Sequence, residues 1–399
     1  MYDVIIAGAG PTGCYLGSLL ARRNLNILIL EEHEEVGKPE HCAGIVSKKL
    51  FSEFNLKTDS ILDEINSVKV CFPDNTRLSL PTSITPLVLD RAKFDKELSI
   101  EAQQSGCQIF FNHKVIQVEN SQNHTLVTVQ TGSETKFFKS KLTVVATGAM
   151  SALPYKLCMA DKTHNYKSAQ LEAQIKDIQG IELFVGSEIA PGTFGYAVKI
   201  DEYRAKIGMI TRNNIVSYFE NFLENSILSS RITKKITTPQ YRSMPFCLPK
   251  TTALGRIITV GDAARQLKTT TGGGVYYGIR CANILAEIIN SADNGNDFNT
   301  SILKKYDKKW KNELRKELTM GLAIRKLLEN VDDHWWNKVG STLQKPEIAS
   351  LVQQYRDFDH HHEFIFSFFR NPAIGKLLLD LIRQNINNGE ALINFWTCC

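Results

Sequence analysis

Short apolar runs and a helical pattern alternate at the start of the chain. Residues 4–7 form an apolar run that leads into a glycine-rich turn, a helical pattern covers about residues 13–24, and residues 26–31 contain a second apolar run. Apolar runs of this length, bounded by turn residues, are typical of buried parallel strands. The pattern therefore predicts a βαβ unit at the N-terminus.

The pattern continues to mix helices and strands up to about residue 146. A helix is expected after the loop 37–46, and Asp90 is a plausible N-cap for a helix that ends near Ser105. Alternating stretches on both sides of Asp74-Asn75 predict a hairpin. Strands are predicted at residues 67–72, 76–80, 106–111, 114–119, 125–131, 137–139 and 142–146.

The pattern changes at about Lys167, where successive alternating strands begin and continue to Thr211. Consecutive strands without intervening helices indicate a second domain built on antiparallel sheet. The alternation of strand and helix returns with a strand over 257–260 and a helix from Thr271 to about Ala292. Beyond Asn299 the spacing of apolar residues is helical. We expect a nucleotide-binding domain, a sheet domain and a helical C-terminal region, made respectively from residues 1–66, 84–153 and 253–298, from 67–83 and 154–252, and from 299–399.

The glycines of the first turn match the demands of a bound dinucleotide. Gly8 permits the tight turn, Gly10 lets the backbone approach a pyrophosphate, and Gly13 lets the helix pack closely on its strand. Glu31 follows about 20 residues later, where a carboxylate can accept ribose hydroxyls. Because strand, glycines, helix and acid coincide, the pattern indicates a nucleotide site.

Composition and charge fit a globular enzyme. The chain has 399 residues, of which 43% are hydrophobic and 22% charged, and a net charge of +5. The densest basic stretch, between Lys304 and Lys311, is expected to be a solvated helix face, although attraction to an anionic membrane remains open. Because no apolar segment reaches about 18 residues, we expect a cytoplasmic protein with possible peripheral contact at the inner face of the cell membrane.

Cysteines and histidines do not form a metal or disulfide pattern. The nine cysteines include no CxxC, so we expect reduced thiols and no metal. The run His360-His361-His362 is expected to lie on the surface, because adjacent imidazoles on a helix or strand point in different directions. The terminal Cys398-Cys399 is expected to be a frayed tail.

The chain resembles the geranylgeranyl reductase family of FAD-dependent flavoproteins, and within it the archaeal digeranylgeranylglycerophospholipid reductase branch. The resemblance covers Met1 to about Ile289 and, more loosely, the helical tail, and it rests on seven motifs. These are Gly8-Ala-Gly-Pro-Thr-Gly13, Glu31, Gly37-Lys-Pro-Glu-His-Cys-Ala-Gly44, Leu89-Asp-Arg-Ala-Lys-Phe-Asp95, Ala146-Thr-Gly148, Gly261-Asp-Ala-Ala264 and Thr271-Gly-Gly-Gly274. It implies an α/β fold of the hydroxybenzoate-hydroxylase type, with a Rossmann-type FAD-binding domain, an antiparallel-sheet substrate domain and a helical C-terminal region.

The resemblance also implies which residues hold FAD. Glu31 would bind the adenosine ribose, Arg91 would lie near the pyrophosphate or the ribityl chain, and Asp262 would hold one of these same two groups. The backbone of Thr12 would face the pyrophosphate and that of Val115 the adenine. The other implied contacts to FAD are made by Gly8, Gly10, Gly13, Cys42, Ala43, Ile45, Gly274 and Val275.

The implied reaction is the reduction of isoprenoid double bonds in prenyl lipids. Such a reaction needs a hydride from the flavin and a proton for the other carbon. Cys42 is a candidate proton donor, with His41 beside it, and a packing role for Cys42 stays open. NAD(P)H or ferredoxin would act as a transient electron donor. No nucleic-acid partner is expected.

Two departures from the family pattern affect the substrate side. The segment Gly195-Tyr-Ala-Val-Lys-Ile200 replaces an aromatic GYxWxFP segment, and Arg265 and Thr269 stand where glycine and proline are usual. We expect Arg265 to alter either the flavin surroundings or the docking of the electron donor. The alternatives that stay open are a monooxygenase or dehydrogenase acting on a smaller apolar substrate, and a non-catalytic lipid-binding protein with a flavin fold.

Overall fold

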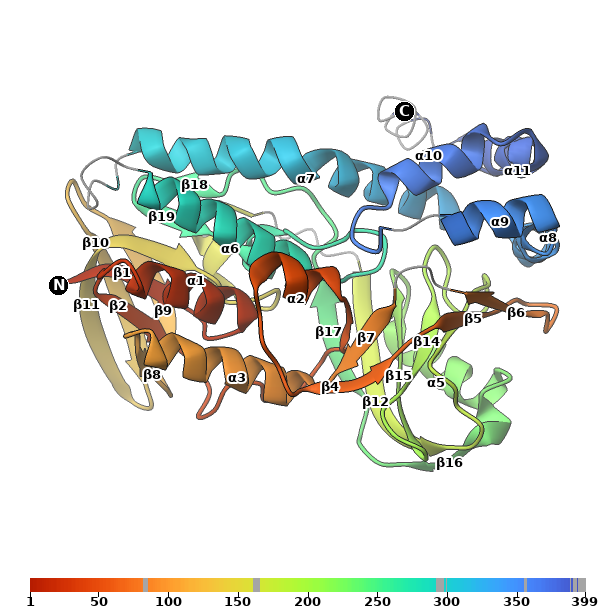
Figure 1. The fold of residues 1–399 in the computed structure, drawn as a ribbon, viewed down its shortest axis with the longest axis horizontal. Helices are drawn as coiled ribbons and strands as arrows, with labels where there is room; N and C mark the ends of the chain where they lie inside the picture. The colour runs from red at the N-terminus through yellow and green to blue at the C-terminus, as the bar shows by residue number, and fades with distance from the viewer. Residues whose placement is uncertain are drawn as a thin grey trace.

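The computed structural model describes residues 1–81, 85–160, 166–291, 298, 300–354, 357–387, 389 and 393. Two large sheets lie at opposite ends of the molecule, and helices of the C-terminal region pass over both of them (Figure 1). The N-terminus lies at the end of the molecule that the first sheet occupies, at the start of β1 (Figure 1). This arrangement leaves the segments between the two sheets to form the candidate site.

The first sheet contains the predicted βαβ unit. Strand β1 (Tyr2–Ala7) lies at its centre and pairs in parallel with β2 (Ile27–Leu30) on one side and β11 (Glu134–Val145) on the other. All four residues of β2 are buried, as expected for a parallel strand covered on both faces. The strand order is β18 (Ala253–Leu254), β19 (Ile257–Thr259), β11, β1, β2 and β8 (Gln108–Phe110), with β9 (Lys114–Asn120) and β10 (Thr125–Thr131) joined to the end of β11.

Helices cover the first sheet, and their buried side chains form one apolar core with it. Helix α1 (Pro11–Ala21) packs against both α3 (Arg91–Gln104) and α6 (Val275–Asn290). The predicted N-cap of α3 is confirmed, since the Asp90 carboxylate accepts a hydrogen bond from the Lys93 amide at 2.9 Å. The short helix α4 (Leu153–Lys156) packs near β9.

One strand prediction in this region is wrong. Residues 137–139 and 142–146 were expected to form two strands, but β11 runs without a break over Glu134–Val145. Its first half pairs antiparallel with β10, and its second half pairs in parallel with β1. The strand changes partners because it leaves a meander and enters the central sheet, and polar Ser140, paired with both Thr125 and Tyr2, marks the change.

The second sheet is mainly antiparallel, as the alternating pattern predicted. Strands β12 (Tyr166–Ile175), β15 (Arg204–Thr211), β14 (Gly195–Lys199) and β13 (Ile181–Phe184) follow one another across it, and β13 pairs in parallel with β5 (Ser67–Cys71). The predicted hairpin of β5 and β6 (Arg77–Pro81) forms one edge. The remaining elements are β16 (Ile232–Lys235) and β17 (Gln240–Met244), which pair with β12, and the covering helix α5 (Ile215–Asn225), with the one-turn helix η1 (Ser229–Arg231) after it.

A small sheet connects the two large ones. Strand β7 (Pro86–Leu89) pairs antiparallel with β3 (Ile45–Ser47) and with β4 (Ile61–Glu64). Helix α2 (Lys49–Phe54) follows β3 directly. This sheet leads the chain from the 37–46 loop to the start of α3, so it positions two of the predicted site segments.

The C-terminal region is helical, as predicted. The long helix α7 (Thr300–Leu328) packs along α6, and its lysines 304, 305, 308 and 309 are exposed, which agrees with a solvated helix face. Helices α8 (Asp333–Leu343), α9 (Pro346–Gln354), α10 (His362–Arg370) and α11 (Gly375–Gln384) lie above the edge formed by β5 and β6 (Figure 1). A single turn, η3 (Pro372–Ile374), joins α10 to α11. In the described parts of the chain, no helix combines the length and the apolar character that crossing a membrane requires.

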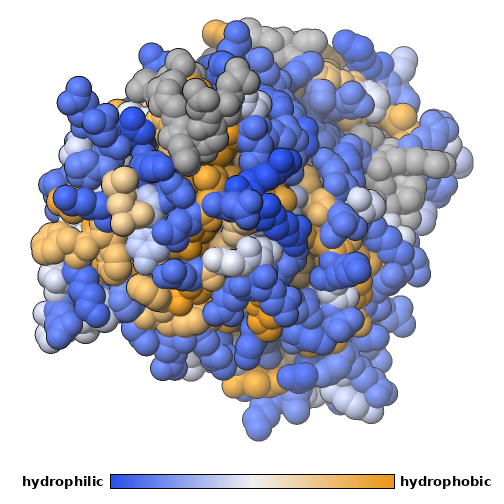
Figure 2. Space-filling view, turned by 60° about the vertical axis from the view of Figure 1, so that its left-hand side comes forward, coloured by the Kyte–Doolittle hydropathy of each residue, from blue (hydrophilic) through white to orange (hydrophobic). Residues whose placement is uncertain are grey.

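The surface is mostly hydrophilic where Figure 2 shows it, with smaller groups of hydrophobic side chains between the charged ones. None of the seven described cysteines forms a disulfide bond. The tail Cys398-Cys399 lies outside the described residues.

Candidate functional site

The first glycine turn has two packed glycines and one open one. Gly8 has a φ of +106°, and a Cβ there would lie 2.5 Å from the carbonyl oxygen of Ala146. A Cβ at Gly13 would lie 2.1 Å from the carbonyl oxygen of Gly8, so this glycine permits close packing of α1 on the turn. A Cβ at Gly10 would meet no atom within 4 Å, so the backbone at Gly10 borders open space at the N-terminus of α1.

Helix α1 presents unpaired amides at this open space. Its first helical hydrogen bond is donated by Cys14 to the Gly10 carbonyl at 3.0 Å, so the amides of Thr12 and Gly13 have no partner within the helix. The Thr12 side chain fills the space that a Cβ at Gly261 or Gly278 would occupy, at 2.9 Å and 2.3 Å from Oγ1. Thr12 therefore contacts both the first glycine turn and the segment that contains Gly261 and Gly278. A phosphate would find free N–H groups and the positive end of the helix dipole here.

Glu31 follows β2 and is oriented by backbone amides. Its Oε2 accepts a hydrogen bond from Ala9 N at 2.8 Å, and its Oε1 accepts one from His33 N at 3.1 Å. The ring nitrogen Nδ1 of His33 lies 2.7 Å from the same Oε1. Glu31 is only 8% exposed, so its carboxylate is held at the turn in one orientation.

The 37–46 loop is anchored by two cations of the second sheet. Lys206, a buried residue of β15, donates from Nζ to the Glu40 carboxylate, and to the Cys42 carbonyl at 3.2 Å. Arg242 of β17 contacts the ring of His41. Burial and the Arg242 charge lower the pKa of His41 to about 4, so this ring is neutral at pH 7 and has no acidic proton to give.

The Cys42 thiol lies beside a buried ion pair. Arg91, the first residue of α3, donates to the Asp95 carboxylate from Nε at 3.0 Å and from Nη2 at 2.9 Å. Burial would lower the pKa of Arg91, but Asp95 and a hydrogen bond with Cys42 raise it above its usual range. The Cys42 sulfur also accepts from the Gly44 amide at 3.4 Å. The structure thus brings together two of the predicted residues, Cys42 and Arg91, and adds Asp95 to them.

Ala43 and Ile45, the other predicted FAD contacts of this loop, pack against apolar residues. They contact a cluster of buried side chains from β7, from the residue after β4 and from the second sheet. That cluster contains Ile65, Val88, Ile181 and Val198. Val115 lies apart from them in β9, where its side chain packs in the core of the first sheet, and only its backbone was predicted to meet adenine.

The Asp262 carboxylate packs directly against the backbone of Gly274. Asp262 lies in the one-turn helix η2 (Gly261–Ala264), and a Cβ at Gly274 would lie 2.2 Å from its Oδ1. Burial raises the pKa of Asp262 to about 6, although the charges of Arg91 and Arg265 oppose that shift. Helix α6 begins at Val275, not at Thr271 as expected, because Gly272, with a φ of +83°, keeps the preceding residues in a loop. Val275 therefore lies at the first position of the helix.

Arg265 is a buried residue, so it does not form an electron-donor docking surface. It is 1% exposed, its φ is +63°, and its guanidinium lies 5.0 Å from the centre of the Tyr155 ring. Its Nη1 donates to the Asp262 carbonyl at 3.3 Å. Of the two roles expected for Arg265, only the alteration of the flavin surroundings is compatible with this burial.

Tyr196 lies near the Cys42 thiol and was not predicted as a site residue. Its hydroxyl donates to the Gln170 side chain at 2.8 Å, and a Cβ at Gly208 would lie 2.4 Å from the same hydroxyl. Burial, with a smaller effect of Cys42, raises the pKa of Tyr196 above its usual range. Lys206 and Arg242 were missed as well. A lysine between alanine and isoleucine in β15 was the available signal for Lys206, because an inward-facing lysine needs a buried partner.

The histidine run, expected on the surface, is half-buried. His361 Nδ1 lies 2.7 Å from the Thr270 hydroxyl, and burial lowers its pKa to about 4. His362 contacts the Glu317 carboxylate of α7, and His360 pairs with Asp357 at 3.1 Å. The run lies at the start of α10, close to α7 and to the loop that carries Thr270. Each of the three rings therefore has a different partner. Among the described residues, no group of three or more His, Cys, Asp or Glu side chains is placed to hold a metal ion.

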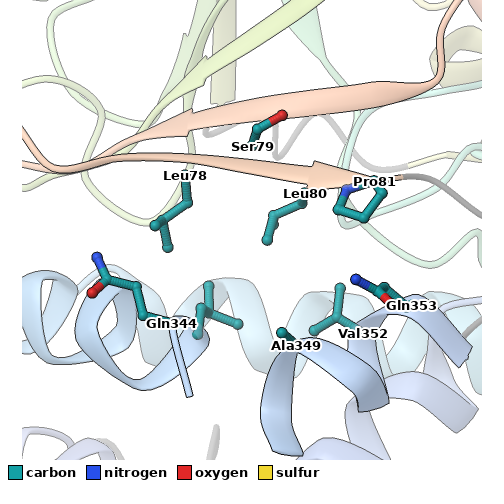
Figure 3. Close-up of a pocket in the computed structure, with 9 residues that line it drawn as sticks. Leu78, Ser79, Leu80, Pro81, Gln344, Ala349, Val352 and Gln353 are labelled. Carbon is teal, nitrogen blue, oxygen red and sulfur yellow. The ribbon is translucent and has the colours of Figure 1, made fainter. Parts of the chain in front are cut away.

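A separate groove of about 200 Å³ lies between β6 and the helices α8 and α9 (Figure 3). Leu80 points from the strand toward Ala349 and Val352 of α9, and Leu78 points toward the end of α8 near Gln344 (Figure 3). The Ser79 side chain points away from the helices (Figure 3). The other lining residues are Pro81, Leu343, Gln344 and Gln353. None of the predicted site residues lines this groove.

Comparison with known proteins agrees with this geometry. Residues 1–180 match the FAD binding domain family. A digeranylgeranylglycerophospholipid reductase of Methanocaldococcus jannaschii is 27% identical over 84% of this chain and 88% of its own, and an uncharacterised protein of the same organism is 26% identical over 96% and 99%. The crystal structure of a geranylgeranyl bacteriochlorophyll reductase-like protein from Thermoplasma acidophilum superposes with a TM-score of 0.81 at 20% identity, over 97% of this chain and 98% of that one.

These findings confirm the predicted fold and the cofactor. The chain carries an FAD-binding domain and is related to the digeranylgeranylglycerophospholipid reductases. Its α/β fold also occurs in flavin-dependent halogenases and in a nitrophenol monooxygenase, each at 15% identity or less, and that likeness shows the fold alone. The residues present fit FAD, since Gly10 borders open space beside free helix amides, and Glu31 is held nearby.

Proposed function

We propose that this FAD-binding relative of the digeranylgeranylglycerophospholipid reductases saturates isoprenoid double bonds in prenyl lipids, with reduced flavin as the hydride source. The observation that carries the proposal is the position of Cys42. Its thiol lies beside the buried Arg91–Asp95 pair, in a loop that is anchored to the second sheet. The named reductase that is 27% identical supports the substrate class.

In this proposal FAD lies along the predicted residues. The amides of Thr12 and Gly13 and the open backbone at Gly10 would bind the pyrophosphate, and Glu31 would bind the ribose. Asp262, Gly274 and Val275, together with Cys42, Ala43 and Ile45 of the loop, would hold the ribityl and ring end. The first sheet then forms the FAD-binding domain and the second sheet the substrate domain, with the helical region after residue 298.

Bound FAD would supply hydride to one alkene carbon when it is reduced. The Cys42 thiol donates the proton to the other carbon and then regains a proton from solvent, so the double bond gains one hydride and one proton. Arg91 holds the sulfur in place through its hydrogen bond, and Lys206 holds the Cys42 carbonyl. The neutral ring of His41 orients the loop through Arg242 and takes no part in proton transfer.

The groove between β6 and α9 is the proposed access route for a lipid chain. Its apolar lining from Leu78, Leu80 and Val352 suits a prenyl tail, and it lies between the second sheet and the C-terminal helices (Figure 3). Exposed lysines of α7 offer a modest attraction to anionic headgroups at the inner face of the cell membrane. Flotation with anionic liposomes, at low and high salt, tests this peripheral contact.

The function itself is tested by anaerobic incubation of the reduced protein with geranylgeranyl lipids, read by mass spectrometry. A gain of two hydrogens per reduced bond supports the proposal. Oxygen-dependent product formation from a smaller substrate would instead identify a monooxygenase, and failure to reduce bound FAD would identify a non-catalytic lipid-binding protein. Comparing NAD(P)H with reduced ferredoxin in the same assay identifies the electron donor.

A further inference from the structure

The loop between η2 and α6, residues 265–274, is held by the C-terminal helical region. From α7, Arg325 donates to the Thr269 carbonyl at 2.7 Å and also to the Thr270 carbonyl. The Thr269 hydroxyl donates back to the Leu318 carbonyl at 2.9 Å. The same loop ends at Gly274 and Val275, which belong to the predicted FAD contacts.

A buried ion pair fixes this loop to the segment before α10. Lys268 Nζ lies 2.7 Å from the Asp359 carboxylate, and the two side chains are only 5% and 1% exposed. The same Nζ donates to the Phe358 carbonyl at 2.9 Å. An ion pair that is so fully removed from water depends on its geometry, because either charge left alone would carry a large desolvation penalty.

Asp359 also reaches the other loop of the candidate site. Its Oδ2 accepts a hydrogen bond from the Ser47 hydroxyl at 2.5 Å, and Ser47 ends β3, directly after the 37–46 loop that carries Cys42. The Asp359 carbonyl accepts from the Tyr277 hydroxyl of α6 at 2.8 Å. One residue of the C-terminal region therefore contacts β3, the 265–274 loop and α6.

The segment that carries Asp359 is itself fixed to α7. The Glu317 carboxylate accepts hydrogen bonds from the backbone amides of His361, at 3.0 Å, and His362, at 3.2 Å. The position of Asp359 is thus set by a helix outside both large sheets.

We propose that Asp359 is a positioning residue, which couples the Cys42 loop to the 265–274 loop and so sets the protein surroundings of the bound flavin. It acts through Ser47 on one side and through Lys268 on the other, without touching the cofactor. The inference rests on the proposed location of FAD between these two loops. Its consequence is that the C-terminal helical region forms part of the cofactor site.

The test replaces Asp359 by asparagine and compares it with Asp380→Asn, which removes the carboxylate of a more exposed pair with Lys338 on α8 and α11. Asp359→Asn should raise the FAD dissociation constant by about tenfold or more and change the visible circular dichroism and midpoint potential of the bound flavin. Lys268→Met should act in the same direction, and the double variant should be no worse than the single ones, because the two residues act as a unit. Asp380→Asn should match the parent.

Ser47→Ala keeps the inference testable if Asp359→Asn does not fold. It removes one hydroxyl and leaves the buried ion pair intact, so a folded protein with an altered flavin spectrum is expected. Parent-like affinity, spectrum and potential in every folded variant of Ser47, Lys268 or Asp359 would overturn the inference. If Glu31→Ala also leaves FAD binding unchanged, the proposed location of FAD fails; if Glu31→Ala weakens binding, only the role of Asp359 fails.

Discussion

The Glu31 carboxylate accepts a hydrogen bond from the Ala9 amide at 2.8 Å, so the acid that follows β2 is tied to the glycine turn that follows β1. The two parallel strands end side by side, and this places the carboxylate and the turn at the same edge of the sheet. Glu31 therefore has two roles to distinguish, shaping the turn and binding the ribose.

Glu31→Ala should weaken FAD binding by on the order of 2–4 kcal/mol, if two charge-assisted hydrogen bonds to the ribose are lost. Isothermal titration of the FAD-free protein measures the change. Glu32→Ala is the matched control, because Glu32 pairs with Lys114 at 2.7 Å on the surface. Equal affinity in parent and Glu31→Ala would remove Glu31 from the ribose site.

Cys42→Ala should keep a normal flavin spectrum and lose alkene reduction by roughly 100-fold or more, the lower end of what a positioned general acid contributes. Cys42→Ser should have an intermediate rate, since its hydroxyl is a poorer acid than a thiol. The exposed thiol of Cys158 provides the control variant Cys158→Ala. Parent rates in both Cys42 variants would show that the thiol only packs, and loss of FAD in both would show a structural role.

Lys206→Met should lower turnover more than FAD affinity, because it frees the Cys42 carbonyl from its buried donor. The variant also leaves the Glu40 carboxylate without this cation, so the free energy of unfolding should fall by roughly 3 kcal/mol. Urea unfolding and steady-state kinetics measure the two effects. Lys234→Met, at an exposed position of the same sheet, should change neither quantity.

The stability of the FAD-free protein should fall as pH rises through the range set by Asp262. Its pKa is raised from 3.8 to about 6, so the folded state holds this proton more tightly than the unfolded state does. The folded state therefore loses stability as pH rises from about 4 to about 6, by roughly 2–3 kcal/mol at most. Asp262→Asn should remove that decline. Urea unfolding from pH 4 to 7 would contradict the assignment if the parent and variant profiles run parallel.

Leu80→Trp should narrow the groove in Figure 3 and slow the reduction of long prenyl lipids more than that of short ones. Its neighbour Ser79 points away from the helices, so Ser79→Trp serves as the control on the same strand (Figure 3). The readout is the ratio of kcat/KM for the long and the short substrate. A ratio equal to that of the parent in Leu80→Trp would exclude the groove as the access route.

The sequence was sufficient for features that depend on neighbouring residues. The turn at Gly8 needs a left-handed backbone that glycine supplies, and Asp90 caps α3 through an amide only three residues away. The antiparallel sheet followed from alternation in single strands, because each strand has one buried and one more exposed face. A dinucleotide site followed from the spacing of the glycines and Glu31, which a single βαβ unit determines. Its assignment to FAD came from the resemblance to a flavoprotein family.

Only the tertiary structure decided which distant side chains meet. The local pattern marks Lys206 as an inward-facing lysine but does not show that it reaches the Cys42 loop from the second sheet, and it gives no sign that Asp359 reaches Ser47 and Lys268 from the C-terminal region. The partners of the histidine run were missed for the same reason, since Thr270 and Glu317 lie on two other elements. The local sequence pattern indicates the backbone conformation that a segment prefers and the side of a helix or strand that is buried. A buried charge instead takes whichever partner the packing of separate elements brings within hydrogen-bond distance.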